Sequence, residues 1–191
     1  RNSRKPVVED GNLMDDLIRR DFTINSMAID IMTGDMVDPF NGLKDINDQI
    51  IKTPVDANIT FSDDPLRQLR CIRFASRFNF NVEKNTLKAI RDNVKRLKIV
   101  SDERILVELD KILCSDHPEY GCNLMATTGL MKHLFPEVLN LNRVDYIDDK
   151  GHKNNFTHTL QVLKNVVQLK GDRILRWTAL LHDIGKSKTK K

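Results

Sequence analysis

Apolar residues recur at helical spacing through most of the chain after residue 64, and this pattern constrains the fold more than any other feature. Three such runs are Leu87, Ile90, Val94 and Leu97, then Ile105, Leu109 and Ile112, and later Phe156, Leu160, Leu163 and Val167. Steps of three and four residues place side chains on one face of an α-helix. Between the second and third runs, prolines and glycines at 118, 121, 129 and 136 predict short helices in a compact unit. We therefore expect a mainly α-helical chain.

Residues beside these runs predict where two helices begin and end. Ser101 suits the N-cap of one helix, with Asp102 and Glu103 in its first turn, where carboxylates are favourable. A final helix is expected from Asp172, its N-cap, to Ile184, with Gly185 just beyond its end.

A β-hairpin is expected near the start of the chain. Residues 26–33 alternate weakly, and Gly34-Asp35 predicts a two-residue turn into a second strand at Met36-Val37. Asp38 then begins a turn. Two short strands cannot bury themselves, so we expect the rest of their sheet to lie upstream of residue 1.

Composition limits the class of protein only broadly. The 191 residues carry a net charge of +4, which suits a polyanionic partner without requiring one. Cys71, Cys114 and Cys122 have no metal-site spacing and predict reduced thiols in a cytoplasmic protein. No apolar run approaches the roughly 20 residues that span a bilayer, so no membrane association is expected.

Residues 63–78 combine an arginine face with an apolar face. On a helix, Arg67, Arg70, Arg73 and Arg77 share one side, and Leu69, Ile72, Ala75 and Phe78 share another. Arginine offers planar, paired donors that suit phosphate or a base edge. Asp64 lies one turn before Arg67, so a carboxylate and a guanidinium could together pair with a nucleobase. Alternatively, Asp64 is an N-cap followed by Pro65 at the first helical position, and the arginines are a solvated face.

The segment from Arg19 to Asn25 also suits a nucleotide. Arg19 and Arg20 could hold a triphosphate, while Asp21 and Asn25 could bind ribose hydroxyls. The alternative is that Asp21 pairs with an arginine and Asn25 bonds to the backbone.

Together these segments resemble the class II tRNA nucleotidyltransferases, the CCA-adding enzymes and their poly(A) polymerase relatives. Residues 63–75, D-D-P-L-R-x-L-R-x-x-R-F-A, are similar to the family's nucleotide-templating motif, and R-R-D-F-T-x-N at residues 19–25 to its ribose-recognition motif. The resemblance implies that Asp64 and Arg67 select ATP and CTP, that Asp21 reads the ribose 2′-hydroxyl, and that Arg20 and Asn25 also bind the nucleotide. Arg70 and Arg73 are added as nucleotide-binding residues because they share the arginine face with Arg67. Asp63 departs mildly from the family's usual Glu.

The resemblance implies an enzyme that adds C and A to tRNA 3′ ends, with tRNA, ATP and CTP as partners and no nucleic acid template. The terminal 3′-hydroxyl would attack the α-phosphate and release pyrophosphate. Such transfer uses two Mg²⁺ ions held by a D-x-D motif that follows a Gly-Gly loop. The chain contains neither motif, so we expect the catalytic carboxylates upstream and this chain alone to be inactive. A poly(A) polymerase of the same superfamily is the alternative.

A third signal lies near the C-terminus. His158 and the pair His182-Asp183, in the context L-L-H-D-I-G-K, resemble the start of an HD domain. The resemblance implies a divalent transition metal or Mg²⁺ on these three residues, with a further Asp ligand expected beyond Lys191. An HD-type phosphohydrolase with an RNA-binding N-terminal part is therefore a second alternative.

These expectations divide the chain into four parts. Residues 1–58 would be the end of a nucleotidyltransferase head domain, and residues 59–113 the nucleotide-selecting neck. Residues 114–150 would be a helical, RNA-binding body, and residues 151–191 a truncated HD domain. The sequence leaves the oligomeric state open.

Overall fold

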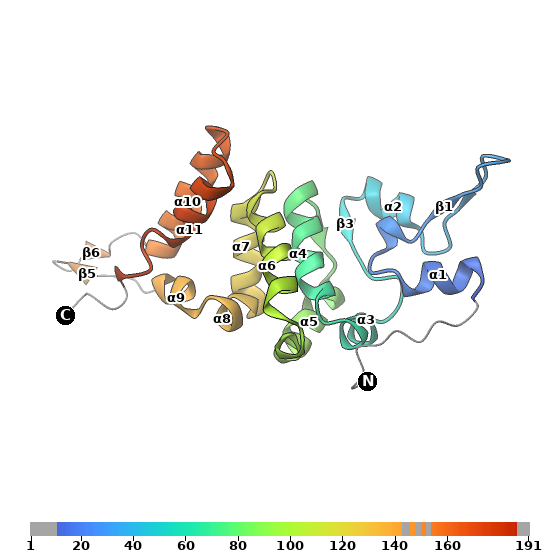
Figure 1. Ribbon diagram of the computed structural model, residues 1–191, viewed down its shortest axis with the longest axis horizontal. Helices are drawn as coiled ribbons and strands as arrows, with labels where there is room; N and C mark the ends of the chain where they lie inside the picture. The colour runs from blue at the N-terminus through green and yellow to red at the C-terminus, as the bar shows by residue number, and fades with distance from the viewer. Residues whose placement is uncertain (1–10, 143–145, 148–149, 152–153, 187–191) are drawn as a thin grey trace.

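The computed structural model describes residues 11–142, 146–147, 150–151 and 154–186. The elements follow one another along the long axis of the molecule, with the N-terminal ones toward one end and α10 (Asn155–Gln168) and α11 (Arg173–Leu181) toward the other (Figure 1). The prediction of a mainly α-helical fold with a short β-hairpin is confirmed. Within the described residues, no helix has the length and apolar character needed to cross a membrane.

The first part of the chain contains short elements on both sides of the predicted nucleotide segment at residues 19–25. They are α1 (Leu13–Arg19), η1 (Thr23–Asn25), β1 (Ala28–Ile29), β2 (Met36–Val37), α2 (Gly42–Asn47) and β3 (Ile50–Ile51). Asn12 caps α1 by accepting from the backbone N–H of Asp15, whose carboxylate accepts from the N–H of Asn12 in return. This reciprocal cap fixes the start of α1, and Arg20 follows its end in extended conformation.

The hairpin differs from the predicted one in length. β1 and β2 pair antiparallel through only two residues each, and residues 30–35 connect them instead of a two-residue turn. The cause lies in Asp30, whose carboxylate accepts from the backbone N–H groups of Met32 and Thr33 and closes a local loop. Asp38 makes the predicted turn, accepting from the N–H groups of residues 42 and 43.

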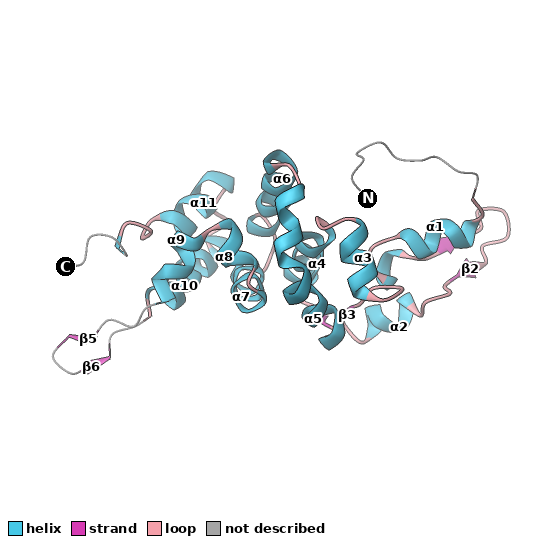
Figure 2. Cartoon of the chain, turned by 90° about the horizontal axis from the view of Figure 1, so that it is seen from below, coloured by secondary structure: helices cyan, strands magenta, loops and turns pink. Residues whose placement is uncertain are grey.

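The middle of the chain is a helical unit, shown from a second direction in Figure 2. Its elements are α3 (Ala57–Asp63), α4 (Arg67–Phe78), β4 (Asn81–Val82), α5 (Lys84–Asn93), η2 (Val94–Ile99) and α6 (Asp102–Leu113). Helix α4 packs against both α6 and α7 (Pro118–Thr128). Leu69, Ile72 and Ala75 of the predicted apolar stripe are fully buried, whereas Phe78 is 43% exposed because it lies at the helix end.

A parallel strand pair ties the first part of the chain to this helical unit. Ile50 and Ile51 of β3 pair with Asn81 and Val82 of β4, directly after α4. Beside them, the N–H of Thr23 donates to the carbonyl of Lys52 at 2.8 Å. These bonds hold the segment that contains Asp21 against the arginine face of α4.

The remaining elements complete the helical array. They are α7 (Pro118–Thr128), α8 (Leu130–Leu134), α9 (Pro136–Leu139), η3 (Asn140–Asn142), β5 (Tyr146–Ile147), β6 (Lys150–Gly151), α10 (Asn155–Gln168) and α11 (Arg173–Leu181). Gly121 lets α7 approach closely, because a Cβ there would lie 2.8 Å from Ile112 and 2.9 Å from Ser76. Asp172 caps α11 as predicted, but this helix ends at Leu181 and not at Ile184. His182 is therefore its C-cap residue.

The N-cap of α5 leads to a testable prediction about stability. The Glu83 carboxylate accepts from the backbone N–H of Thr86 at 2.8 Å and from its hydroxyl at 3.0 Å. Burial acts to raise the pKa of Glu83, but hydrogen bonds from Asn85 and Thr86 outweigh it and lower the pKa below its usual value. A lowered pKa means that the cap stabilises the protein above pH about 4.3 and that this contribution is lost as the pH falls below that value.

We therefore expect Glu83→Ala to lower the free energy of unfolding by about 1 kcal/mol at pH 7 and by less at pH 3. Urea unfolding of both proteins at the two pH values measures the difference. Glu83→Gln, which keeps an acceptor oxygen without a titrating proton, serves as the matched control. A deficit in Glu83→Ala of equal size at both pH values would contradict the role of the ionised carboxylate.

Candidate functional site

A polar pocket of about 380 Å³ lies where the first part of the chain meets α4 and α6. Its lining residues are Arg20, Asp21, Asn25, Asp64, Leu66, Arg67, Arg70 and Arg104. Six of the seven residues predicted to bind a nucleotide are therefore brought together, although they are up to 50 positions apart in the sequence. Four arginines and two aspartates give the lining an excess of positive charge, which favours a polyanionic ligand.

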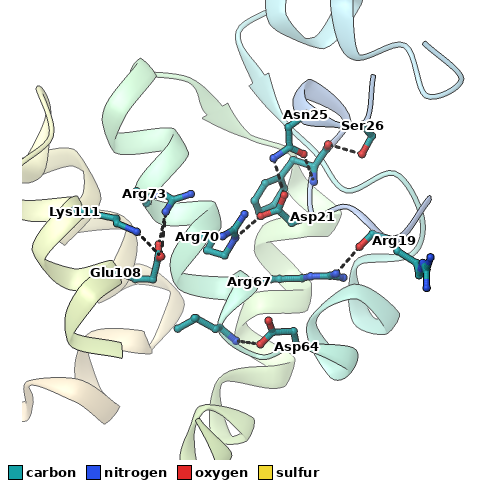
Figure 3. Close-up of polar contacts among 12 residues, drawn as sticks. Arg19, Asp21, Asn25, Ser26, Asp64, Arg67, Arg70, Arg73, Glu108 and Lys111 are labelled. Carbon is teal, nitrogen blue, oxygen red and sulfur yellow. Dashed lines mark hydrogen bonds and ion pairs between the residues drawn. The ribbon is translucent and has the colours of Figure 1, made fainter. Parts of the chain in front are cut away.

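Asp21 is the most buried acidic group of the pocket, with 4% of its surface exposed. Its Oδ2 accepts from Arg70 Nε at 2.5 Å and its Oδ1 from Asn25 Nδ2 at 2.7 Å (Figure 3). Burial acts to lower the pKa of Arg70, but the hydrogen bond and the charge of Asp21 raise it above its usual value. The Arg70 guanidinium therefore stays charged, and its bond to Asp21 joins the two predicted nucleotide segments.

Arg20 and Arg67 donate hydrogen bonds to different acceptors. Arg20 donates to the Asp16 carboxylate at 2.8 and 3.0 Å and to the backbone carbonyl of Asn25 at 3.0 Å. Arg67 donates to the backbone carbonyl of Arg19 (Figure 3). Both guanidiniums line the pocket. These hydrogen bonds leave other N–H groups of each guanidinium available, since arginine has five donors.

Asp64 lies at the junction between α3 and α4. Its Oδ1 accepts from the backbone N–H of Leu66 at 3.1 Å, and its Oδ2 lies 3.3 Å from Arg104 Nη2. Helix α4 begins at Arg67, after a turn at Pro65 and Leu66. Asp64 is extended and accepts from the N–H two residues further on, as an N-cap residue does, so the capping alternative agrees with this geometry. The Asp64 carboxylate also lines the pocket.

Arg104 is the charged lining residue that was not predicted from the sequence, and the other unpredicted one is the apolar Leu66. Arg104 lies in the first turn of α6, which carries Ser101 at its N-cap as predicted. A cation at the N-terminus of a helix is unfavourable for the helix dipole, and this mismatch was a signal that Arg104 has another partner.

Arg73 lies away from the pocket, unlike the other predicted residues. Its Nη1 donates to Glu108 Oε1 at 3.1 Å and lies 2.9 Å from Oε2 (Figure 3). Its guanidinium carbon also lies 4.5 Å from the ring centre of Phe74. Burial lowers the pKa of Arg73 despite the charge of Glu108. Its role in nucleotide binding stays a prediction that this geometry does not favour.

The three predicted metal ligands form a second site. One ligand atom each of His158, His182 and Asp183 lies within 4.8 Å of the others. The carbonyl of Ala179 lies 2.8 Å from His182 Nδ1 and can only accept, so Nδ1 carries the proton and Nε2 is left for a metal. Burial acts to raise the pKa of Asp183, but the hydrogen bond from Lys186 and the positive charge nearby lower it below its usual value. An ionised carboxylate and two imidazoles are a donor set that suits a divalent transition metal.

Two protein families match this chain. Residues 1–52 match the poly(A) polymerase head domain, and residues 79–141 match a probable RNA- and SrmB-binding site of polymerase A. Together these matches cover more than half of the chain, and they include Arg20, Asp21, Asn25 and Arg104 of the pocket lining. The fold and the site thus define a protein of the nucleotidyltransferase class.

Curated relatives and a solved structure identify the family more closely. The chain is 39% identical over 190 residues to the multifunctional CCA protein of Shewanella frigidimarina, covering 96% of this chain and 45% of that protein. It is 38% identical over 175 residues to the mitochondrial CCA tRNA nucleotidyltransferase of Candida glabrata, covering 84% and 33%. The crystal structure of the Bacillus stearothermophilus CCA-adding enzyme in complex with CTP superposes with a TM-score of 0.73 at 30% identity, covering 91% of this chain and 40% of that one.

This chain belongs to the family of tRNA nucleotidyltransferases and poly(A) polymerases, and the relatives compared with it are CCA-adding enzymes. It spans less than half the length of these relatives.

Proposed function

We propose that this chain supplies the nucleotide-selecting pocket of an enzyme that adds C and A residues to the 3′ ends of tRNA from CTP and ATP. The observation that carries the proposal is the meeting of Asp64 and Arg67 with Asp21 and Asn25 in one pocket. The names of the relatives, which are CCA-adding enzymes, support the same activity.

The chemistry of Asp64 and Arg67 suits adenine and cytosine. Both bases present an amino group beside a ring nitrogen that accepts a hydrogen bond. A carboxylate only accepts and a guanidinium only donates, so this pair complements that edge. Guanine and uracil present a carbonyl and an N–H in the same places. The carbonyl would then face the Asp64 carboxylate, which is also an acceptor, and the N–H would face the Arg67 guanidinium, which is also a donor. Unpaired polar groups in a binding site give strong rejection, so GTP and UTP would be excluded.

The remaining lining residues suit the ribose and the triphosphate. The Asp21 carboxylate has about four acceptor positions, so it could receive a 2′-hydroxyl while keeping its bonds to Arg70 and Asn25. Arg20 and Arg70 would then face the phosphates, whose charge the surplus of arginines favours.

Nucleotide preference tests this function directly. Calorimetry with ATP, CTP, GTP and UTP should give binding of the first two only, both to this chain and to the full-length protein that contains it. Incorporation of labelled C and A into tRNA lacking its 3′ end should follow in the full-length protein. Use of ATP alone would favour poly(A) or A-only addition, and equal binding of all four nucleotides would sink the proposal.

Nucleotidyltransferases generally use divalent metals, and we infer that Mg²⁺ serves here. The carboxylates that line the pocket do not fit as its ligands, because Asp21 is paired with Arg70 and Asp64 with Arg104. Its ligands are therefore placed outside the residues that line this pocket, and the residues named here bind and orient the nucleotide.

The domain organisation of the chain is also part of the proposal. We assign residues 1–58 to the head domain, 59–113 to the neck, 114–150 to an RNA-binding body and 151–191 to part of an HD domain. tRNA would lie along the neck and body, and the cytoplasm is the proposed location.

The cluster of His158, His182 and Asp183 favours a second function, that of an HD-type metal site. Two imidazoles favour a transition metal over Mg²⁺, which prefers oxygen ligands. A metal held there could activate water for hydrolysis of a phosphate ester.

Replacing one ligand of this cluster is expected to weaken metal binding. We expect His182→Ala to lower the affinity for Mn²⁺ or Ni²⁺ by more than about tenfold, since even outer-shell partners contribute that much. Calorimetry on the full-length protein measures the change. His133→Ala is the matched control, because His133 is exposed in α8 and lies outside the cluster. Equal affinity in the His182→Ala and His133→Ala variants would rule out the site.

A further inference from the structure

Arg104 lines the nucleotide pocket, but it lies in α6, outside both nucleotide-binding segments. It lies in the first turn of α6 (Asp102–Leu113), 40 residues after Asp64, and its Nη2 lies 3.3 Å from Asp64 Oδ2. More than half of the Arg104 side chain is exposed, and exposed ion pairs of this kind contribute little to stability. Its position in the first turn is also unfavourable for the helix dipole. Stability alone therefore does not account for Arg104.

The contact falls on the group whose orientation decides base selection. The terminal torsion of an aspartate has a broad preference, so the carboxylate plane is set by its hydrogen bonds. Here Leu66 N–H donates to Oδ1 and Arg104 donates to Oδ2, so each oxygen already has one donor from the protein. Each carboxylate oxygen can accept a second bond, so the remaining lone pairs stay available to a base.

Helix α6 makes this contact from a fixed position. Glu108 lies one turn after Arg104 on the same face of α6, and its buried carboxylate pairs with Arg73 of α4. The two pairs, Arg104 with Asp64 and Glu108 with Arg73, hold α6 against both the start and the middle of the selecting helix. The distance between Arg104 and Asp64 is thus set by helix packing as well as by their charges.

We infer that Arg104 is a positioning residue for nucleotide selection, which orients the Asp64 carboxylate toward the amino group of adenine or cytosine. The inference rests on the proposed function. Arg104 acts through Asp64 and makes no contact of its own with the base. Loss of Arg104 would therefore free the carboxylate plane and weaken discrimination between bases, while the binding of phosphates and ribose would remain.

The test uses the full-length protein and measures kcat/KM for each of the four nucleotides. Arg104→Ala is expected to reduce the preference for ATP and CTP over GTP and UTP about tenfold, since small misplacements of a selecting group have effects of this order or larger. Arg104→Lys, which keeps a cationic donor, is expected to recover part of that preference. Arg91→Ala is the matched control, because Arg91 is an exposed, hydrogen-bonded arginine that does not line the pocket.

A double-mutant cycle with Asp64→Ala separates positioning from a structural effect. If Arg104 acts through Asp64, Arg104→Ala has no further effect on discrimination once Asp64 is removed. Equal loss of kcat/KM for all four nucleotides, or additive effects in the double variant, would overturn the inference. An unaltered protein that does not prefer ATP and CTP overturns the proposed function as well. A selective protein whose Arg104→Ala variant is equally selective overturns the role of Arg104 alone.

Discussion

Arg67→Ala is expected to reduce kcat/KM for ATP and CTP on the order of a hundredfold, because a paired contact from arginine to a base edge contributes about 1–3 kcal/mol of discrimination. The use of GTP and UTP should change far less, so the preference among the four nucleotides nearly disappears. Nucleotide incorporation by the full-length protein measures both quantities. Arg67→Lys keeps the charge but loses the planar pair of donors, so it should retain binding and lose selectivity.

The matched control is Arg77→Ala. Arg77 lies in the last turn of the same helix, is exposed, and its guanidinium carbon lies 5.5 Å from the ring centre of Phe78 and outside the pocket. Arg67 also donates to the carbonyl of Arg19, so its loss could loosen the first part of the chain. Thermal unfolding of each variant separates these effects. An Arg67→Ala protein with an unchanged Tm and unchanged nucleotide preference would contradict the selecting role.

Local patterns in the sequence predicted the helices well, and six of the seven residues predicted to bind a nucleotide meet in one pocket. Helical spacing depends on backbone geometry alone, so the apolar faces of α4, α5 and α6 follow from it directly. The two nucleotide segments were recognised by short motifs, and the structure brings Asp21 and Arg70 into contact across 49 positions. Cap residues such as Ser101 and Asp172 also have local causes, and both lie where they were expected.

Long-range contacts account for most of the differences. The sequence placed Arg73 with the nucleotide because it shares a helix face with Arg67 and Arg70. Residues on one face of a helix can contact different neighbouring elements, however, and α6 places Glu108 opposite Arg73. Likewise, no pattern near Asp64 indicates Arg104, since the contact depends on how α6 packs against α4. The parallel pairing of β3 with β4 was not predicted for the same reason.

The largest effect on stability is expected at Glu108. Its carboxylate is 5% exposed and pairs with Arg73, which is 14% exposed, while Lys111 lies 3.4 Å away. Glu108→Ala would leave the Arg73 guanidinium buried without its partner, a change that costs about 3–5 kcal/mol. We expect a loss of that order in the free energy of unfolding, measured in urea. Glu83→Ala, which removes a partly exposed cap, should cost far less.

Replacing both partners distinguishes the cost of a buried charge from the value of the pair. Arg73→Met combined with Glu108→Met removes both charges and keeps apolar volume, so its stability should return close to that of the unaltered protein. This folded double variant also decides the role of Arg73. Because the Arg73 guanidinium pairs with Glu108 and does not line the pocket, the double variant should bind ATP and CTP with unchanged affinity. A tenfold loss of nucleotide affinity in a protein of normal stability would contradict this, and it would mean that Arg73 acts on the nucleotide either directly or through the position of α6.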